Sequence, residues 1–249
     1  MESVKRVKKE AVTFFEHLDE LRKRLLIALT AVGVCSVVSY AFSDRLLNFL
    51  LKPIQQEIGQ LYFFTPQEAF VVKIKIALLS GFLVALPVVL WQLWLFISPA
   101  LHVNEKKAAW PLVIVTTSLF VSGVLFAFFL VLPVAFKFLL SMETEFLKPM
   151  ISVSEYIDFL NSMLLAFGIS FNMPVFVMAF VLSGMVDAET LNRYQKHAIV
   201  LIFIAAAILT PGPDIASQFL LAIPLLILFE ISVLGAFLIK KRKPNRAKP

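Results

Sequence analysis

Six long runs of apolar residues, separated by short polar segments, restrict what this chain can fold into. The runs cover about 25–42, 69–97, 110–136, 156–182, 198–209 and 215–239. A membrane-spanning helix needs ~20 apolar residues, so six spans would use about half of the chain. Only 16% of the 249 residues are charged and 59% are hydrophobic, which leaves too little charge for a soluble surface and too few polar residues for disorder. The pattern predicts an all-α, polytopic membrane protein with six transmembrane helices in one membrane domain.

Proline and one short run shape this expectation. Four runs contain a proline, namely Pro87, Pro133, Pro174 and Pro224, and each predicts a kink, because neighbouring groups in a bundle can satisfy the freed carbonyl. The fifth run covers only ~18 Å, against a hydrocarbon core of ~30 Å. The segment 210–214 then stops the helix, so the last two runs should form a tight hairpin in a locally thinned bilayer. A re-entrant loop is the alternative.

The basic residues orient the chain. With six spans, 17 of the 23 Lys and Arg residues fall on the side of the two termini and 6 on the other. This asymmetry predicts that the N-terminal segment 1–24 and the basic tail 240–249 are both cytoplasmic. The first run is longer than a signal-peptide core, which indicates a retained span. The net charge of +6 therefore reflects orientation and not nucleic-acid binding, and the tail is expected to bind lipid headgroups, with another protein as the alternative.

Acidic residues on this basic side are the first candidates for a site. In segment 14–25, His17, Glu20 and Arg24 share one helical face, which predicts an amphipathic helix at the cytoplasmic surface. An ordinary surface helix with the ion pairs Asp19–Lys23 and Glu20–Arg24 explains the pattern equally well. The functional interpretation is an acidic patch made by Glu16, Asp19 and Glu20. Glu105 is the only acidic residue of the short loop after the second run, and it should lie on the same side.

Five stretches, in order, resemble one known family. They are 16–24 (EHLDELRKR), 94–107 (WLFISPALHVNEKK), 166–174 (AFGISFNMP), 209–218 (LTPGPDIASQ) and 229–231 (FEI). The first resembles the HLxELRxR signature of TatC, the multispanning subunit of the twin-arginine protein translocase. The others look like its first cytoplasmic loop, its fourth span, its last hairpin and its sixth span.

This resemblance implies a fold and a function. The expected fold is a concave, glove-like bundle in a bacterial-type cytoplasmic (inner) membrane. The expected function is binding of twin-arginine signal peptides of folded proteins, followed by recruitment of single-span TatA/TatB-type subunits for export driven by the proton-motive force. Homo- and hetero-oligomers are implied, and membrane lipid is a further partner.

The resemblance also assigns residues to the signal-peptide site. Glu20 and Glu105 are the expected main ligands, since a carboxylate suits the planar fork of an arginine. Phe96 belongs to the same site by the family match. Arg22, with Arg24, is expected to orient these carboxylates or to anchor to lipid phosphate rather than to touch a cationic ligand.

Four polar residues lie within or beside the later runs. Asn172 stands where the family commonly has Glu, so it either lines a polar cavity or makes a helix–helix hydrogen bond. Gln218 is expected to face single-span partners, with a polar contact between helices as the alternative. Asp214 lies in the segment that joins the last two runs. It is expected either to serve the same partner-facing role as Gln218 or to cap the last helix. Glu230 lies deeper in the sixth run, where a carboxylate is costly and suggests a role.

Other classes of protein fit less well. A secondary transporter of a small solute is the alternative, but it needs ionisable groups along several spans, and few are present. An enzyme is not expected, because HExxH, GxxxxGK[ST] and GxSxG are all absent from the sequence. The single Cys35 and three His residues have no metal-ligand spacing, so neither a metal nor a cofactor is predicted.

Overall fold

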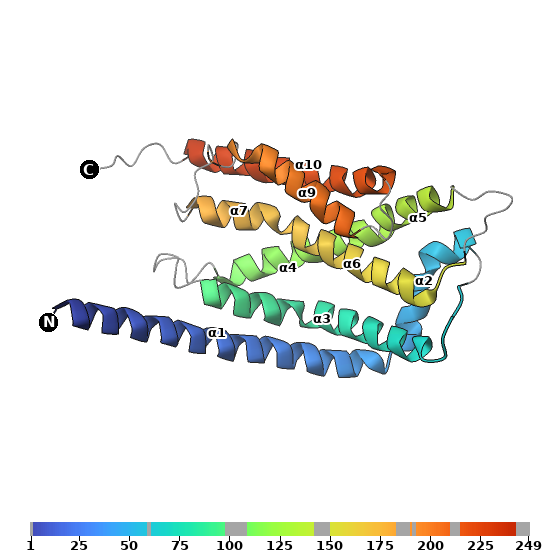
Figure 1. The fold of residues 1–249 in the computed structure, drawn as a ribbon, viewed down its shortest axis with the longest axis horizontal. Coiled ribbons are helices and arrows are strands. Elements are labelled where there is room, and N and C mark those ends of the chain that lie inside the picture. Colours follow the sequence, from blue (N-terminus) through green and yellow to red (C-terminus); the bar gives the residue numbers. More distant parts are fainter. Residues whose placement is uncertain are drawn as a thin grey trace. The chain divides into compact units, whose positions relative to one another are not determined.

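The computed structural model describes residues 2–58, 61–97, 109–141, 150–182, 190, 193–209 and 215–242, with side chains from His17 onward for most of them. The chain path is shown in Figure 1. The described elements are α1 (Glu2–Tyr40), α2 (Ser43–Ile58), α3 (Glu68–Ile97), α4 (Ala109–Phe126), the π-helical segment η3 (Ala127–Val131), α5 (Leu132–Leu140), α6 (Val153–Phe171), α7 (Met173–Leu182), α9 (Gln195–Leu209) and α10 (Ile215–Arg242).

The fold is all-helical, as the apolar runs predicted. The described ranges contain no strand, and a single isolated bridge joins Tyr62 to Ser152. Within the described ranges, three stretches are long and apolar enough to cross a membrane, Glu68–Phe96, Trp110–Leu140 and Val153–Val181, and α1 with α2 forms a fourth if counted as one broken span. The apolar stretches found in the last two helices are shorter, Gln195–Ile208 in α9 and Leu221–Gly235 in α10. These helices are compatible with six spans, and the count of six stays a prediction.

The N-terminal charged segment and the first apolar run form one continuous helix. The 39 residues of α1 include both. The charged segment ends at Arg24 and the apolar run begins at Leu25, and this boundary contains no proline or turn sequence that would end a helix. A turn at Ala41 and Phe42 ends the helix, and the 16-residue α2 follows at once.

The prolines act in two different ways. Helices α3 and α10 continue through Pro87 and Pro224. Before Pro133 the helix widens into η3, and before Pro174 it breaks in a turn at Asn172. Proline lacks the N–H that would bond to the carbonyl four residues earlier, and a π turn or a helix break accommodates the missing bond. The fourth run is thus two helices, α6 and α7.

The short fifth helix is confirmed. Helix α9 has 15 residues, which span about 22 Å and fall below the ~30 Å of a hydrocarbon core. Helix α10 is long, at 28 residues, and packs against α9.

The described residues form two compact units by their contacts. Unit 1 consists of Met1–Ser43 and Ala77–Thr117, and unit 2 of Asp44–Ile76 and Ser118–Pro249. In unit 1, α3 packs closely on α1, because Gly81 has no side chain and the backbone of Ser36 takes that space. On α4, Thr116 accepts a hydrogen bond from the indole N–H of Trp94 at 3.3 Å.

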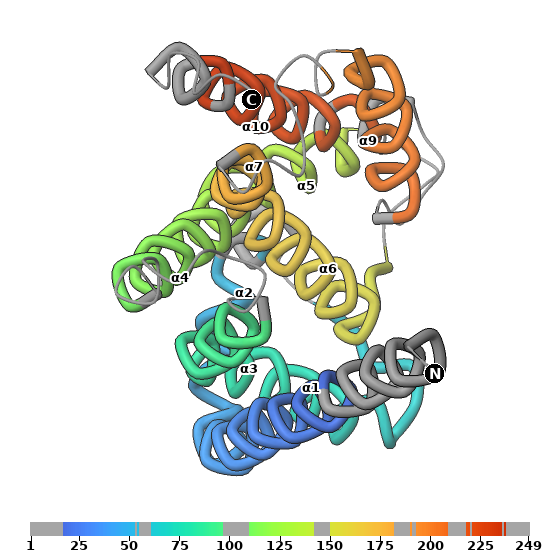
Figure 2. The backbone as a smooth tube through the Cα atoms, turned by 90° about the vertical axis from the view of Figure 1, so that its left-hand side faces the viewer, coloured from blue at the N-terminus to red at the C-terminus, as the bar shows by residue number. Residues whose placement is uncertain are grey.

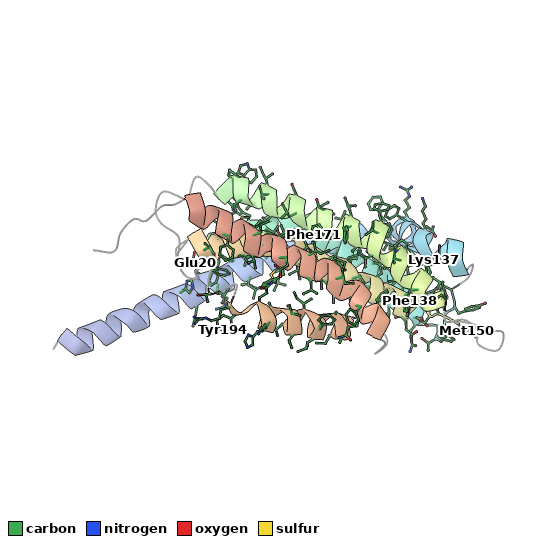
Figure 3. The ribbon with its side chains drawn as sticks, turned by 90° about the horizontal axis from the view of Figure 1, so that it is seen from above. Glu20, Lys137, Phe138, Met150, Phe171 and Tyr194 are labelled. Atoms are coloured by element: carbon green, nitrogen blue, oxygen red, sulfur yellow. The ribbon has the colours of Figure 1, made fainter. Side chains whose placement is uncertain are left out.

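In unit 2, α6 is the central helix. Its Tyr156 hydroxyl donates to the carbonyl of Leu50 on α2 at 2.6 Å, and the Phe136 ring of α5 packs against Tyr156 with centroids 5.2 Å apart. Helix α10 lies beside α7 and α9 (Figures 1 and 2). Figure 3 shows Lys137 and Met150 near one end of this unit and Tyr194 at the opposite end.

A polar latch, formed by Glu68 and Ser152, joins the turn before α3 to the start of α6. The Glu68 carboxylate accepts hydrogen bonds from the hydroxyl of Ser152, from the backbone N–H of Phe64 at 2.8 Å and from that of Ser154 at 3.1 Å. Ser152 also caps α6 by accepting from the backbone. The pattern Thr65-x-x-Glu68 is a capping-box signature, so local sequence explains half of the latch. The other half depends on a residue far along the chain.

Candidate functional site

The predicted ligand Glu20 is held by its own helix. Arg24 donates to Oε1 of Glu20 through Nε at 3.0 Å and through Nη2, and the two residues are one helical turn apart. The other carboxylate oxygen, Oε2, lies 3.9 Å from Nδ1 of His17. The hydrogen bond from Arg24 holds the pKa of Glu20 below its usual value. Glu20 is therefore an ionised acceptor at neutral pH.

This pair confirms one of the two ion pairs that helical spacing predicts. The Glu20 side chain is 35% exposed and that of Arg24 is 20% exposed, so the contact is partly shielded from water. Among the described residues no ion pair joins Asp19 to Lys23, although both side chains are described. Arg24 therefore holds the Glu20 carboxylate, and whether this contact prepares Glu20 for a ligand or competes with one stays a prediction.

His17 connects this group to the end of α3. Its ring stacks on that of Phe96, with centroids 4.5 Å apart and planes 13° from parallel. Two of the predicted site residues, Glu20 and Phe96, thus contact the same histidine within unit 1. The sequence did not indicate this role of His17, because 79 residues separate the rings and no local pattern reports such a contact.

Arg22 lies on a different surface of α1. With Asp19 and Lys23 it forms the polar end of a groove of about 780 Å³, and the rest of the lining is mostly apolar. That lining consists of Leu26, Ile27, Thr30, Ala31, Val34 and Cys35. The Thr30 hydroxyl donates to the Leu26 carbonyl at 2.7 Å, so its hydrogen bond is satisfied within the helix. The groove runs from the charged part of α1 into its apolar part.

Some predicted residues lie outside the described residues. They are Glu105, between α3 and α4 in the sequence, and Asp214, between α9 and α10, and the side chain of Glu16 is also outside. Their assigned roles stay predictions.

Asn172 lies at the break between α6 and α7 and is only 2% exposed. Its Nδ2 donates to the carbonyl of Gly168 at 3.0 Å, within the same helix. Its Oδ1 is buried and has no hydrogen-bond partner among the described residues. Buried polar atoms are normally paired, so an unpaired acceptor at this position requires an explanation.

Gln218 and Glu230 both connect α10 to α9. Gln218 donates through Nε2 to the carbonyl of Phe203 at 2.8 Å, which is the interhelix contact that the sequence left as an alternative. Glu230 accepts a hydrogen bond from Nε2 of Gln195, at the start of α9. Neither contact tests the predicted role toward single-span partners, but each shows what the side chain does within the chain.

The described part of the chain shows no metal-binding cluster. Its His, Cys, Asp and Glu residues form no group of three that could hold a metal ion. Cys35 is a free thiol of intermediate exposure.

The helical fold, the long apolar helices and the charged end of α1 define a multi-helix membrane protein. The family model described as Sec-independent protein translocase protein (TatC) matches residues 16–224. The chain belongs to this TatC family, whose members are components of the twin-arginine protein translocase and are not enzymes. A role in twin-arginine translocation follows and replaces the alternative of a solute transporter.

Individual relatives agree with this assignment. The chain is 40% identical over 232 residues to the Sec-independent protein translocase protein TatC of Carboxydothermus hydrogenoformans, covering 93% of this chain and 96% of the relative. It is 41% identical over 233 residues to that of Aquifex aeolicus, covering 92% and 96%. Its structure is similar to a crystal structure of the twin arginine translocase receptor TatC, with a TM-score of 0.82, 40% identity and coverage of 90% of this chain and 99% of the other.

Proposed function

We propose that this chain is the receptor subunit of the twin-arginine translocase and binds twin-arginine signal peptides at its cytoplasmic face. Glu20 and Glu105 are the main ligands of the two arginines. Phe96 belongs to the same site, whereas Arg22, on the other surface of α1, anchors to lipid phosphate. The observation that carries the proposal is the cluster in which His17 contacts both Glu20 and Phe96, because it gathers residues of two separate motifs.

The energetics require more than one ion pair. An exposed pair contributes about 0–1 kcal/mol, and a partly desolvated pair at an interface couples by about 1.5 kcal/mol or more. Hydrophobic contacts must supply the remaining affinity. The groove on α1 offers apolar surface directly after the charged segment, and the hydrophobic part of a signal peptide is its proposed occupant.

The later helices have a second proposed role. We propose that the polar residues Asn172, Gln218, Asp214 and Glu230 serve the recruitment of single-span TatA/TatB-type subunits. The unpaired Oδ1 of Asn172 is buried at the break between α6 and α7, so it serves recruitment only if this break rearranges when a partner binds. Transport is then driven by the proton-motive force in homo- and hetero-oligomers. The protein lies in the bacterial-type inner membrane with both termini cytoplasmic.

The binding site can be tested by crosslinking to a signal peptide. We expect Glu20→Ala and Glu105→Ala each to reduce crosslinking of a twin-arginine peptide severalfold, because each removes one carboxylate partner. Glu155→Ala is the matched control, since Glu155 is an exposed carboxylate in the first turn of α6. All variants should insert into the membrane normally.

A twin-lysine version of the same peptide completes the test. It should crosslink more weakly than the twin-arginine peptide to the unmodified chain, because a lysine lacks the planar fork. Unchanged crosslinking in both glutamate variants would remove the assigned site. Equal recovery of the two peptides would remove the proposed function itself.

A further inference from the structure

We propose that Arg24 occupies Glu20 in the unliganded protein as an internal competitor, and that a signal-peptide arginine must displace it. Arg24 is thereby a specificity-determining residue. The inference rests on the proposed function, since it assumes that Glu20 receives a signal-peptide arginine.

The geometry supports competition. Arg24 directs two N–H groups, on Nε and Nη2, to the same oxygen of Glu20. A bidentate arginine uses both oxygens of a carboxylate, so an incoming guanidinium needs the Oε1 position that Arg24 holds. The remaining oxygen, Oε2, faces His17 at 3.9 Å. Full engagement of the carboxylate by a peptide arginine therefore requires Arg24 to leave.

The exchange explains a preference for arginine over lysine. When a peptide arginine replaces Arg24, one guanidinium–carboxylate contact of Glu20 replaces another. The new contact offsets the free energy lost when the internal pair breaks. A peptide lysine brings a compact ammonium without a fork, so it breaks the aligned contact of Arg24 and does not restore it. The internal pair thus penalises lysine more than arginine.

The alternative for Arg24 is simple orientation of the carboxylate. In that case Arg24 prepares Glu20 for the peptide, and its removal weakens binding. Competition predicts the opposite sign. The two readings are therefore separated by the direction of a single affinity change.

The experiment measures equilibrium binding of fluorescent twin-arginine and twin-lysine signal peptides to the full chain in lipid nanodiscs. We expect Arg24→Gln to tighten binding of the twin-arginine peptide about two- to fivefold, the range that a partly exposed ion pair contributes. The twin-lysine peptide should gain more, so the discrimination between the two peptides should narrow. Arg24→Lys should fall between Arg24→Gln and the unmodified chain. Glutamine and lysine both favour helices, so α1 should persist in each variant.

Two further variants separate pairing from bulk charge. Lys23→Gln removes the same charge one residue away, and its effect should be smaller. In the Glu20→Gln background, Arg24→Gln should give no gain, because the contact to be released no longer exists. A gain that persists in this background, or an equal gain from Lys23→Gln, would overturn the proposal in favour of a general charge effect.

The outcomes also distinguish this inference from the proposed function. If Glu20→Gln weakens binding and the unmodified chain prefers twin arginine, but Arg24→Gln has no effect or weakens binding, then competition by Arg24 is wrong and the binding site stands. If the unmodified chain binds both peptides equally and Glu20→Gln changes nothing, the proposed function fails, and the inference fails with it.

Discussion

At the scale of single residues, the polar side chains of this protein differ in how many of their hydrogen-bonding atoms have a partner. The Glu20 carboxylate has its Arg24 partner, and Gln218 and Glu230 each have one on the neighbouring helix. Asn172 has a partner for Nδ2 but none among the described residues for Oδ1. An acceptor that costs stability without serving the fold is a candidate for function.

Replacing Asn172 tests this distinction. Leu has a similar shape, so Asn172→Leu should change stability in detergent by less than about 1 kcal/mol, the lost hydrogen bond being worth about 0.6 kcal/mol. Export of a twin-arginine substrate should nevertheless fall, because the acceptor is gone. Asn172→Glu, which restores the carboxylate typical of the family, should retain export. Normal export by Asn172→Leu would exclude a polar requirement at this position.

Residue-level prediction from sequence worked where partners are local. The Glu20–Arg24 pair follows from helical spacing, since residues four apart lie on one face. The stacking of His17 on Phe96 could not be predicted, because it joins residues far apart in the chain and depends on how α1 packs on α3. The same limit applies to the Ser152 side of the Glu68 latch.

At the scale of elements, the close approach of α1 and α3 depends on one glycine. A Cβ atom at Gly81 would overlap the backbone of Ser36, which cannot move aside as a side chain can. Gly33, on α1 itself, has open space where a Cβ would lie among the described residues. The two glycines therefore form a matched pair, in similar helices of the same unit but in opposite surroundings.

Alanine at each position gives opposite predictions. Gly81→Ala should lower the stability of the protein by about 1–3 kcal/mol, because it overpacks the contact of α1 with α3. Gly33→Ala should raise stability by up to about 1 kcal/mol, because alanine favours the helix. Thermal unfolding in detergent measures both. Shifts of equal sign and size would contradict the close packing of the two helices.

Element positions were predicted well from the apolar runs, and helix interruptions less well. The run 69–97 corresponds to α3, and the short fifth run to α9. The proline rule located the irregularities near Pro133 and Pro174 but not the turn at Ala41 and Phe42, and it did not tell which proline positions would interrupt a helix. Helix α3 is continuous through Pro87, whereas the chain breaks before Pro174, because packing decides whether a freed carbonyl finds a new partner.

At the scale of the whole molecule, the distribution of basic residues is the strongest statement that the sequence makes about orientation. It predicts that both termini lie in the cytoplasm and that the turn before α3 lies on the other side of the membrane. Gln67 is an exposed residue of that turn, and Asn245 belongs to the basic tail. Their predicted positions on opposite sides of the membrane give a direct test.

Thiol labelling checks this orientation. In a Cys35→Ala background, Gln67→Cys should react with a membrane-impermeant reagent in intact cells. Asn245→Cys should react only after the cytoplasmic membrane is opened. Labelling of Asn245→Cys in intact cells would reverse the predicted topology.

The latch between Glu68 and Ser152 has a consequence for biosynthesis. Its two side chains are 84 residues apart, and at about 5–20 residues per second a ribosome needs roughly 4–17 s to make that length. During this interval the carboxylate must remain hydrated, since its serine partner has not yet been made. The turn that starts α3 is therefore completed by a residue synthesised seconds later, and the rate of translation sets the earliest moment at which this part of the protein can close.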